Sequence, residues 1–392
     1  YLKHHGFHGE SICLECRDPV KMNEDIMNIT DASMLAEDNY LVSDNESEAH
    51  ASYFYCGPEW AEFRKSYKPI HGYLSLLISL FGTISNALNI MVLSKKEMNT
   101  PTNKILCGLA VCDMLVMLDY IPFACHMYIF TERPPSEFYA YKWAVFVLFH
   151  AHFNQIFHTI SIWMTLTLAV WRYISITYPD KNKQWCSPER AVFAIVLPFI
   201  VSPIICIPSF LAFSIQPVPP NRYNITGFIL QSSDMAMLNS RLLERINLWL
   251  YSVVIKLIPC IILTVISVGL IRTLDKANKR KMRLLSMQNY VNNSKRSANA
   301  EKQADRTTKM LLAVLFLFLV TEAPQGIVGL LGGILGNHFM HECYQQMAEP
   351  MDFLALINNA INFILYCSMS SQFRDTFRKL FLIRCGTEAG PS

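Results

Sequence analysis

The chain has 392 residues, of which 52% are hydrophobic and 17% are charged, and its formal net charge is +3. This composition is typical of a membrane protein and argues against a soluble enzyme. The apolar residues are grouped in long blocks along the chain, with polar segments between them.

Residues 1–66 form an acidic N-terminal segment, with thirteen acidic and five basic residues and few large apolar ones before Tyr53. Such a segment cannot bury a core, so we predict a disordered extracellular tail. It contains the sequons Asn28-Ile-Thr and Asn45-Glu-Ser, which are candidate N-glycosylation sites. The chain opens at Tyr1 in place of Met, which suggests a truncated start.

Seven apolar blocks follow, each long enough to cross the ~30 Å of membrane hydrocarbon as a helix of about 20 residues. The third and seventh blocks carry more polar residues than a lipid-facing helix would, so we expect them inside the bundle. The sequence thus predicts an all-α membrane protein, with a seven-transmembrane-helix bundle in residues 67–370. The predicted spans lie near Ile70–Leu93, Lys104–Ile129, Trp143–Ile176, Ala191–Phe213, Leu248–Ile271, Met310–Ile334 and Pro350–Tyr366.

The lysine and arginine residues predict how the bundle is oriented. Segments on one side of the spans hold 22 of them, eleven between Arg272 and Lys309, whereas the other side holds eleven. Because basic loops stay in the cytoplasm, the N-terminus is predicted outside and the C-terminus inside. A third sequon, Asn224-Ile-Thr, then falls outside. We expect residues 272–309 to form two helix extensions around a mobile loop.

Residues 371–392 begin with Phe373, Phe377 and Phe381 at helical spacing, among basic residues. This pattern predicts a short amphipathic eighth helix along the inner membrane surface, followed by a cytoplasmic tail. Cys385 in that tail is a candidate palmitoylation site.

Polar residues within the spans are informative, because each costs a few kcal/mol unless it has a partner or water. Asn358, Asn362 and Tyr366 are spaced four apart, so they share one helix face that can join Asp113 and Ser161 in a hydrated core. The carboxylate and its neighbours can hold a sodium ion at Asp113, Ser161, Asn358 and Asn362. A water-filled hydrogen-bond network without an ion is the alternative.

Several of these motifs resemble those of rhodopsin-like G-protein-coupled receptors, over about residues 69–385. The third span ends in WRYISITYP, and the seventh ends in NFILY. Prolines lie in the fifth and sixth spans, where the family has kinks. The resemblance implies that activation and coupling to a heterotrimeric G protein depend on Arg172, Tyr173, Pro179, Pro259, Phe318, Pro324, Asn362 and Tyr366.

Three features depart from the family pattern. Trp171 replaces the acidic neighbour of Arg172, so its local carboxylate clamp is missing. Glu301 or Asp305 can substitute for that acid, and without a substitute we expect raised basal signalling. Phe363 replaces a proline of the seventh span, which removes a kink-forming residue.

The third departure is the missing disulfide between the third span and the second outer loop. Val147 stands near its first position, and the loop from Ile207 to Cys260 contains no cysteine between those residues. Cys56 and Cys343 are then the outer candidates for a disulfide that ties the tail to the third outer loop in an oxidising compartment.

A ligand pocket is expected to open outward between spans three, five, six and seven. Several acids there favour a cationic ligand. Amine receptors of the resembled family hold the ligand's amine on an aspartate in span three, and Asn154 stands near that position here, which argues against an amine. Glu322 is our hypothesis for the ligand's counter-ion, and an internal salt bridge to Lys256 is the alternative. The predicted pocket residues are Asp119, His150, Asn154, His158, Lys256, Glu322, Gln325, Glu349 and Asp352.

The TEAPQG of the sixth span, the WRYI motif and the missing disulfide resemble invertebrate myosuppressin and FMRFamide-like receptors. The resemblance implies a plasma-membrane receptor for an amidated peptide that ends in Arg-Phe. Its implied partners are a G protein, of the inhibitory type, and arrestin, and the membrane lipid surrounds it. Neither nucleic acid nor a cofactor besides sodium is expected.

Other classes stand as alternatives. An enzyme would need a nucleophile with a base or a metal cluster, and the sequence lacks HExxH, GxSxG and Walker patterns. A channel or transporter would show inverted repeats, broken paired helices or a charged ring. A decoy or orphan receptor that binds a peptide without signalling is the stronger alternative, and Trp171 favours it.

Overall fold

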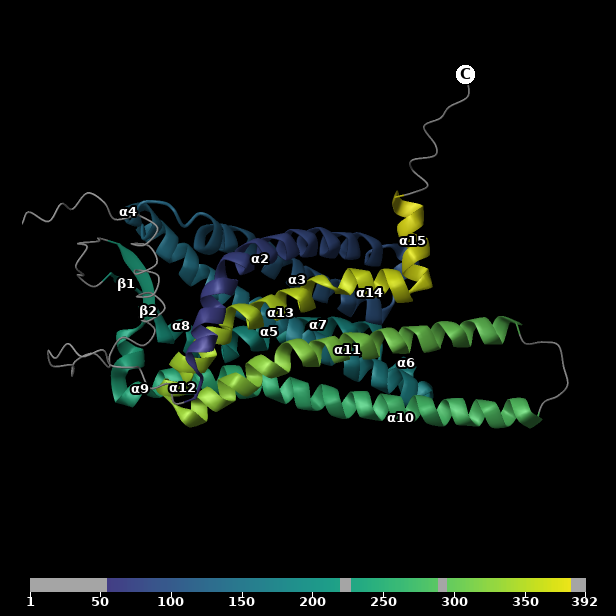
Figure 1. The fold of residues 1–392 in the computed structure, drawn as a ribbon. Helices are drawn as coiled ribbons and strands as arrows, with labels where there is room; N and C mark the ends of the chain where they lie inside the picture. Colours follow the sequence, from purple (N-terminus) through teal and green to yellow (C-terminus); the bar gives the residue numbers. More distant parts are fainter. Residues whose placement is uncertain (1–54, 219–226, 288–294, 382–392) are drawn as a thin grey trace, which may run out of the picture.

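The computed structural model describes residues 55–218, 227–287 and 295–381, and Figure 1 shows them as an elongated bundle of long helices. The candidate modification sites Asn28, Asn45, Asn224 and Cys385 lie outside these residues, as does most of the predicted tail. A two-stranded sheet marks one end of the bundle, which we call the hairpin end. The helix α15 marks the opposite end, which we call the α15 end.

The helices, including short 3-10 and π-helical segments labelled η, are α2 Pro58–Leu93, η2 Lys96–Met98, α3 Pro101–Ala124, η3 Cys125–Ile129, α4 Pro135–Phe138, α5 Tyr141–Thr177, α6 Pro179–Trp185, α7 Pro188–Ile205, α8 Ile207–Ala212, α9 Asp234–Trp249, η4 Leu250–Leu257, α10 Ile258–Met287, α11 Lys295–Leu335, α12 Asn337–Phe339, η5 Met340–Tyr344, η6 Gln345–Met347, α13 Ala348–Ala360, α14 Asn362–Met369 and α15 Ser371–Phe381. The strands are β1 Phe213–Pro217 and β2 Phe228–Ser232.

Six of the described helical stretches are long and apolar enough to cross a membrane, and Glu342–Ala360 with Asn362–Ser368 makes a seventh if this bent pair is one span. The predicted seven-helix bundle is therefore confirmed. The exposed side chains of α7, such as Phe193, Ile200 and Ile204, are apolar and suit contact with lipid.

The seventh span is bent by 40° between α13 and α14, although Phe363 stands where the family has a proline. The loss of that proline therefore does not straighten the helix. The break lies at Ile361, and next to it the Asn362 Nδ2 donates to Asp113 Oδ2 at 2.9 Å across the bundle.

The first helix begins much earlier than the sequence predicted. Helix α2 starts at Pro58, so the predicted boundary between tail and bundle at residue 66 is too late. Proline in the first turn and the acidic Glu59 both favour a helix start there. Phe63 and Tyr67 then stack on successive turns, with ring centroids 5.6 Å apart.

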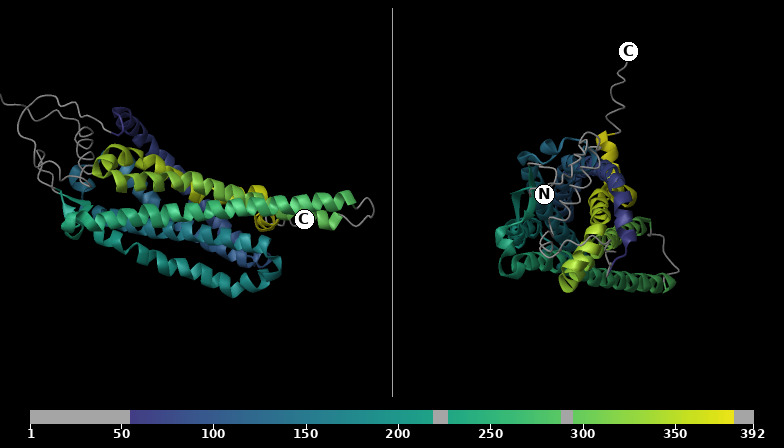
Figure 2. Two further views of the ribbon diagram at one scale, coloured as in Figure 1. Left: turned by 90° about the horizontal axis from the view of Figure 1, so that it is seen from below. Right: turned by 60° about the vertical axis from the view of Figure 1, so that its left-hand side comes forward.

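The α15 end carries the predicted helix extensions and the amphipathic helix. Helices α10 and α11 continue past their apolar spans and project side by side beyond the other helices, as Figures 1 and 2 show. The segment 288–294 between them lies outside the described residues. Helix α15 lies across the bundle and packs Phe373 and Phe377 against Phe363, with ring centroids 6.0 and 5.8 Å away.

The hairpin of β1 and β2 is held without a disulfide. The strands are antiparallel, with Phe213 opposite Ser232. The amide of Phe228 donates to the Tyr139 carbonyl at 2.8 Å, and Gly227 lies so close to Tyr139 that a Cβ there would collide with it. Ile229 is buried in a small cluster with Phe138 and Tyr139.

Three contacts tie the start of α2 to the segment that enters the seventh span. A disulfide joins Cys56 and Cys343, the two cysteines that the sequence singled out. The amide of Tyr55 donates to Glu342 Oε2 at 2.9 Å, and Arg64 Nε lies 3.2 Å from both carboxylate oxygens of Glu349.

We expect the disulfide to stabilise the hairpin end, so Cys56→Ser, Cys343→Ser and the double variant should each lower the free energy of unfolding by about 2–4 kcal/mol. Thermal unfolding of the purified protein in detergent measures the loss. Cys125→Ser, which removes a free thiol near the same end, serves as the control. Additive losses in the double variant would contradict a single shared bond.

Candidate functional site

A cavity of about 540 Å³ lies between the helices near the hairpin end. Its wall combines residues of α3, α5, η4, α11 and α13, and β2 closes part of it with Phe228, Ile229 and Leu230. This volume is in the range of ligand sites in proteins.

Only part of the predicted pocket set lines this cavity. Asn154, His158, Gln325 and Asp352 do. Within the described part of the chain, the cavity wall does not include Asp119, His150, Lys256, Glu322 or Glu349. Each of these five side chains has a partner inside the protein, which the sequence alone did not reveal.

Asp119 and His150 pair with each other between α3 and α5. The Asp119 Oδ2 lies 2.6 Å from His150 Nδ1, and the imidazole stacks on Phe123 with ring centroids 3.8 Å apart. Both side chains are nearly inaccessible. Asp119 is therefore paired with His150 in this structure and is not among the residues that line the cavity.

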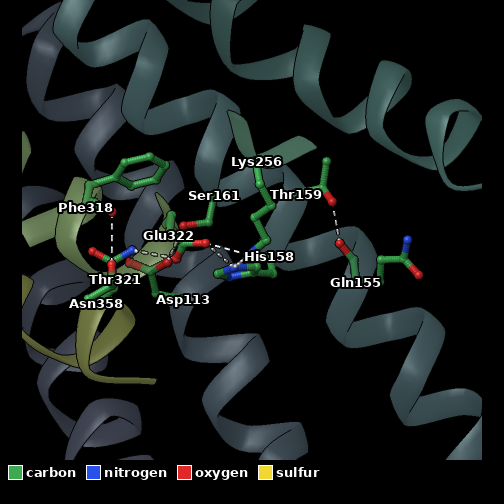
Figure 3. Close-up of polar contacts among 10 residues, drawn as sticks. All are labelled: Asp113, Gln155, His158, Thr159, Ser161, Lys256, Phe318, Thr321, Glu322 and Asn358. Carbon is green, nitrogen blue, oxygen red and sulfur yellow. Dashed lines mark hydrogen bonds and ion pairs between the residues drawn. The ribbon is translucent and has the colours of Figure 1, made fainter. Parts of the chain in front are cut away.

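Glu322 of α11 is the centre of a buried ion pair, which Figure 3 shows. Its Oε2 lies 2.5 Å from Lys256 Nζ of η4 and 3.2 Å from His158 Nε2 of α5, and both Glu322 and Lys256 have no exposed surface. In this structure Glu322 is thus paired inside the protein and is not among the residues that line the cavity, and its role as the ligand's counter-ion stays a prediction. The internal salt bridge, which was the alternative, is what forms.

The imidazole of His158 completes this ion pair. Lys256 Nζ also lies 2.8 Å from His158 Nε2. An ammonium group only donates, so the neutral imidazole accepts from Lys256 and the carboxylate accepts from another N–H of the same ammonium. Because His158 also lines the cavity, the ion pair lies directly beneath the candidate site.

The predicted polar core divides into two groups. Asp113 accepts from Ser161 at 2.6 Å through Oδ1 and from Asn362 at 2.9 Å through Oδ2. Asn358 instead donates to Glu322 Oε1 at 3.5 Å, so it does not share the carboxylate of Asp113. Tyr366 is buried near the α15 end.

The predicted coupling residues gather toward the α15 end. Arg172 has no hydrogen bond or ion pair among the residues whose side chains are described, and Trp171 is buried in the main core. The candidate acids Glu301 and Asp305 lie in a part of α11 whose side chains fall outside that description. Tyr173 packs against Gly269 of α10, where an added Cβ would lie 3.0 Å from its ring.

The three predicted prolines lie at the start of a helix or within one, and Phe318 lies in the core. Pro179 begins α6, Pro259 lies in the first turn of α10 just after the π-helical η4, and Pro324 lies inside α11. Phe318 is buried, and its carbonyl accepts from Thr321 Oγ1 at 3.1 Å.

The aromatic part of the cavity wall was not among the residues that the sequence predicted for the pocket. His126, Phe138 and Trp143 form a stack, with His126 4.0 Å from Trp143 and 4.7 Å from Phe138 between ring centroids. All three line the cavity. The dense aromatic run from Phe138 to Trp143 was the available signal.

The buried pair gives a stability prediction. Lys256→Met or Glu322→Met alone should lower the free energy of unfolding by about 3–5 kcal/mol, because each leaves the other charge buried without its partner. The double variant should regain most of that loss, since it buries no charge at this position. Thermal unfolding of the four proteins gives the coupling energy, and additive single losses would contradict the pair.

Comparison with known proteins agrees with this architecture. The profile of the family described as "Serpentine type 7TM GPCR chemoreceptor Srw" matches residues 73–384. The chain is 30% identical over 363 residues to the G-protein coupled receptor dmsr-1 of Caenorhabditis elegans, with 83% of this chain and 71% of that protein covered.

Two insect proteins are also similar. The Sex peptide receptor of Drosophila melanogaster is 28% identical over 328 residues, which cover 81% of this chain and 73% of that receptor. The FMRFamide receptor of the same fly is 22% identical over 325 residues, which cover 80% and 54%. The enzyme alternative is excluded, because this family consists of receptors. The chain therefore belongs to the seven-transmembrane G-protein-coupled receptors of the serpentine Srw type, among relatives that include invertebrate peptide receptors.

Proposed function

We propose that this receptor binds an amidated peptide of the myosuppressin or FMRFamide-like kind and activates a heterotrimeric G protein. The observation that carries the proposal is the cavity at the hairpin end, with its stacked aromatic wall and β2 across it. Its volume suits the end of a short peptide. The names of two relatives, sex peptide receptor and FMRFamide receptor, support a peptide ligand.

We propose that the hairpin end faces the cell exterior at the plasma membrane. The excess of lysine and arginine lies in segments at the α15 end, including those of α10 and α11, which supports a cytoplasmic location for that end. The disulfide of Cys56 and Cys343 needs an oxidising compartment, which supports an external hairpin end.

Activation is proposed to move the inner part of α11 outward, with Pro324 as the flexible point. Among the described side chains Arg172 has no hydrogen bond or ion pair, which supports a contact with the G protein once α11 moves, and the sequences of α10 and α11 at the α15 end are rich in lysine and arginine. Inhibitory coupling and arrestin binding are part of the proposal on family resemblance, as are Tyr173, Pro179, Pro259, Phe318, Asn362 and Tyr366 in activation.

A sodium ion in the bundle core is also proposed. The Asp113 carboxylate and the Ser161 hydroxyl oxygen are hard ligands that fit it. Asn362 directs its Nδ2 donor at Asp113, and Asn358 faces Glu322, so the two amides fit the ion less well. When bound, the ion would neutralise the buried carboxylate.

The decoy receptor is the second candidate, which the buried Trp171 beside Arg172 favours. Peptide binding without nucleotide exchange on any G protein would support it over our proposal.

A panel of short amidated peptides on cells that express the chain, followed with sensors for several G-protein classes, tests the function. We expect peptides that end in Arg-Phe-amide to activate at least one sensor, and their free-acid forms to be weaker by about tenfold or more, because the extra charge is costly in an apolar cavity. Arg172→Ala should remove signalling without removing peptide binding. A panel that contains no activating peptide would contradict the proposal.

Basal signalling should fall in Trp171→Asp, because a carboxylate next to Arg172 favours the resting state. An ion pair of about 1 kcal/mol would shift a two-state equilibrium about fivefold. Trp171→Asn is the control, since it makes a similar change in size without a charge. Equal basal activity in the two variants at matched surface expression would rule out the charge effect.

A further inference from the structure

Asp352 differs from the other predicted pocket acids in lining the cavity without a partner among the described residues. It lines the cavity from α13, and among the described residues it has no hydrogen-bond or ion-pair partner. Glu349, one turn earlier on the same helix, is paired with Arg64, and Glu322 is paired with Lys256. Asp352 is thus the carboxylate left to face the cavity in the part of the chain that the structure describes.

Three tyrosines line the same cavity as Asp352. Tyr120 comes from α3, Tyr251 from η4 and Tyr344 from η5, and all three line the cavity together with Asp352. Each phenol also lies within electrostatic reach of the Asp352 carboxylate. A carboxylate that lines a cavity beside aromatic side chains attracts a cation, since ring faces carry negative charge.

The chemistry favours a guanidinium over an ammonium group. A planar guanidinium can donate two parallel hydrogen bonds to a carboxylate while its faces lie on aromatic rings, whereas an ammonium is a compact and strongly hydrated charge. A partly buried carboxylate without a partner is costly, so a bound cation that pairs with it gains affinity.

The same cavity offers a place for an aromatic side chain. The stack of His126, Phe138 and Trp143 forms an aromatic part of the cavity wall, in contrast to the charged carboxylate of Asp352. The Arg133 guanidinium lies 5.2 Å from the centre of the Trp143 ring, which holds that ring in place.

We propose that Asp352 and the tyrosines Tyr120, Tyr251 and Tyr344 form the subsite for the ligand's guanidinium group, and that the aromatic stack takes the neighbouring phenyl ring. This inference rests on the proposed function, because it assigns the two side chains of an Arg-Phe-amide terminus to two parts of one cavity. It replaces Glu322 with Asp352 as the ligand's counter-ion.

The test uses two small probes that differ mainly in charge. Acetyl-Arg-Phe-amide carries a guanidinium, and acetyl-citrulline-Phe-amide has nearly the same shape without the charge. Their affinities for the purified full chain follow from the rise in Tm with probe concentration. We expect the arginine probe to bind about tenfold to a hundredfold more tightly than the citrulline probe.

In Asp352→Asn the two probes should bind equally, and Asp352→Glu should restore part of the difference. Asp234→Asn is the matched control, since it makes the same change at an exposed position on α9 and should keep the full difference. Because Asp352 has no described partner, Asp352→Asn should fold with a Tm at least equal to that of the parent chain.

The outcomes separate the two proposals. If Asp352→Asn keeps the full preference for the arginine probe, the subsite is wrong while the peptide function stands. If the parent chain binds the two probes equally, the cavity does not recognise a guanidinium group and the subsite proposal is wrong. If the amidated-peptide panel activates no sensor, the proposed function itself fails.

Discussion

The ion pair of Glu322 with Lys256 is the interaction on which the organisation of the bundle depends. Two charges with no exposed surface are tolerable in a membrane-spanning bundle only because they satisfy each other at 2.5 Å. From the third span His158 accepts from Lys256, and from the seventh span Asn358 donates to Glu322. The ion pair thus joins four spans just below the cavity, and any movement of α11 has to rearrange all of these contacts.

This pairing determines which charges are available to a ligand. Glu322, Glu349 and Asp119 all lie near the hairpin half of the bundle, yet Lys256, Arg64 and His150 occupy them. A ligand that competed for one of these acids would leave its present partner unpaired in a poorly hydrated place. The cavity can therefore use an acid only if the protein has left it unpaired, as it has left Asp352.

The hairpin end shows how the chain does without the disulfide that the family usually has there. Close packing of Gly227 on Tyr139 and the hydrogen bond from Phe228 hold β2 over the cavity. The disulfide of Cys56 and Cys343 instead fixes the start of α2 against the entrance to the seventh span. Both sets of contacts are expected to limit the motion of the cavity rim. The first holds β2, and the second holds the start of α2.

The sequence by itself determined the seven-span architecture, since apolar length and the positions of basic residues are local properties that need no knowledge of packing. It also identified Cys56 with Cys343, and it named Lys256 with Glu322 as one of two alternatives. It placed the start of α2 too late, because helix propensity near Pro58 is weaker than the hydropathy signal that begins near Ile70. Only the tertiary structure decided which acids are paired, since ion pairs join side chains from different spans whose rotation about their own axes is set by packing across the whole bundle.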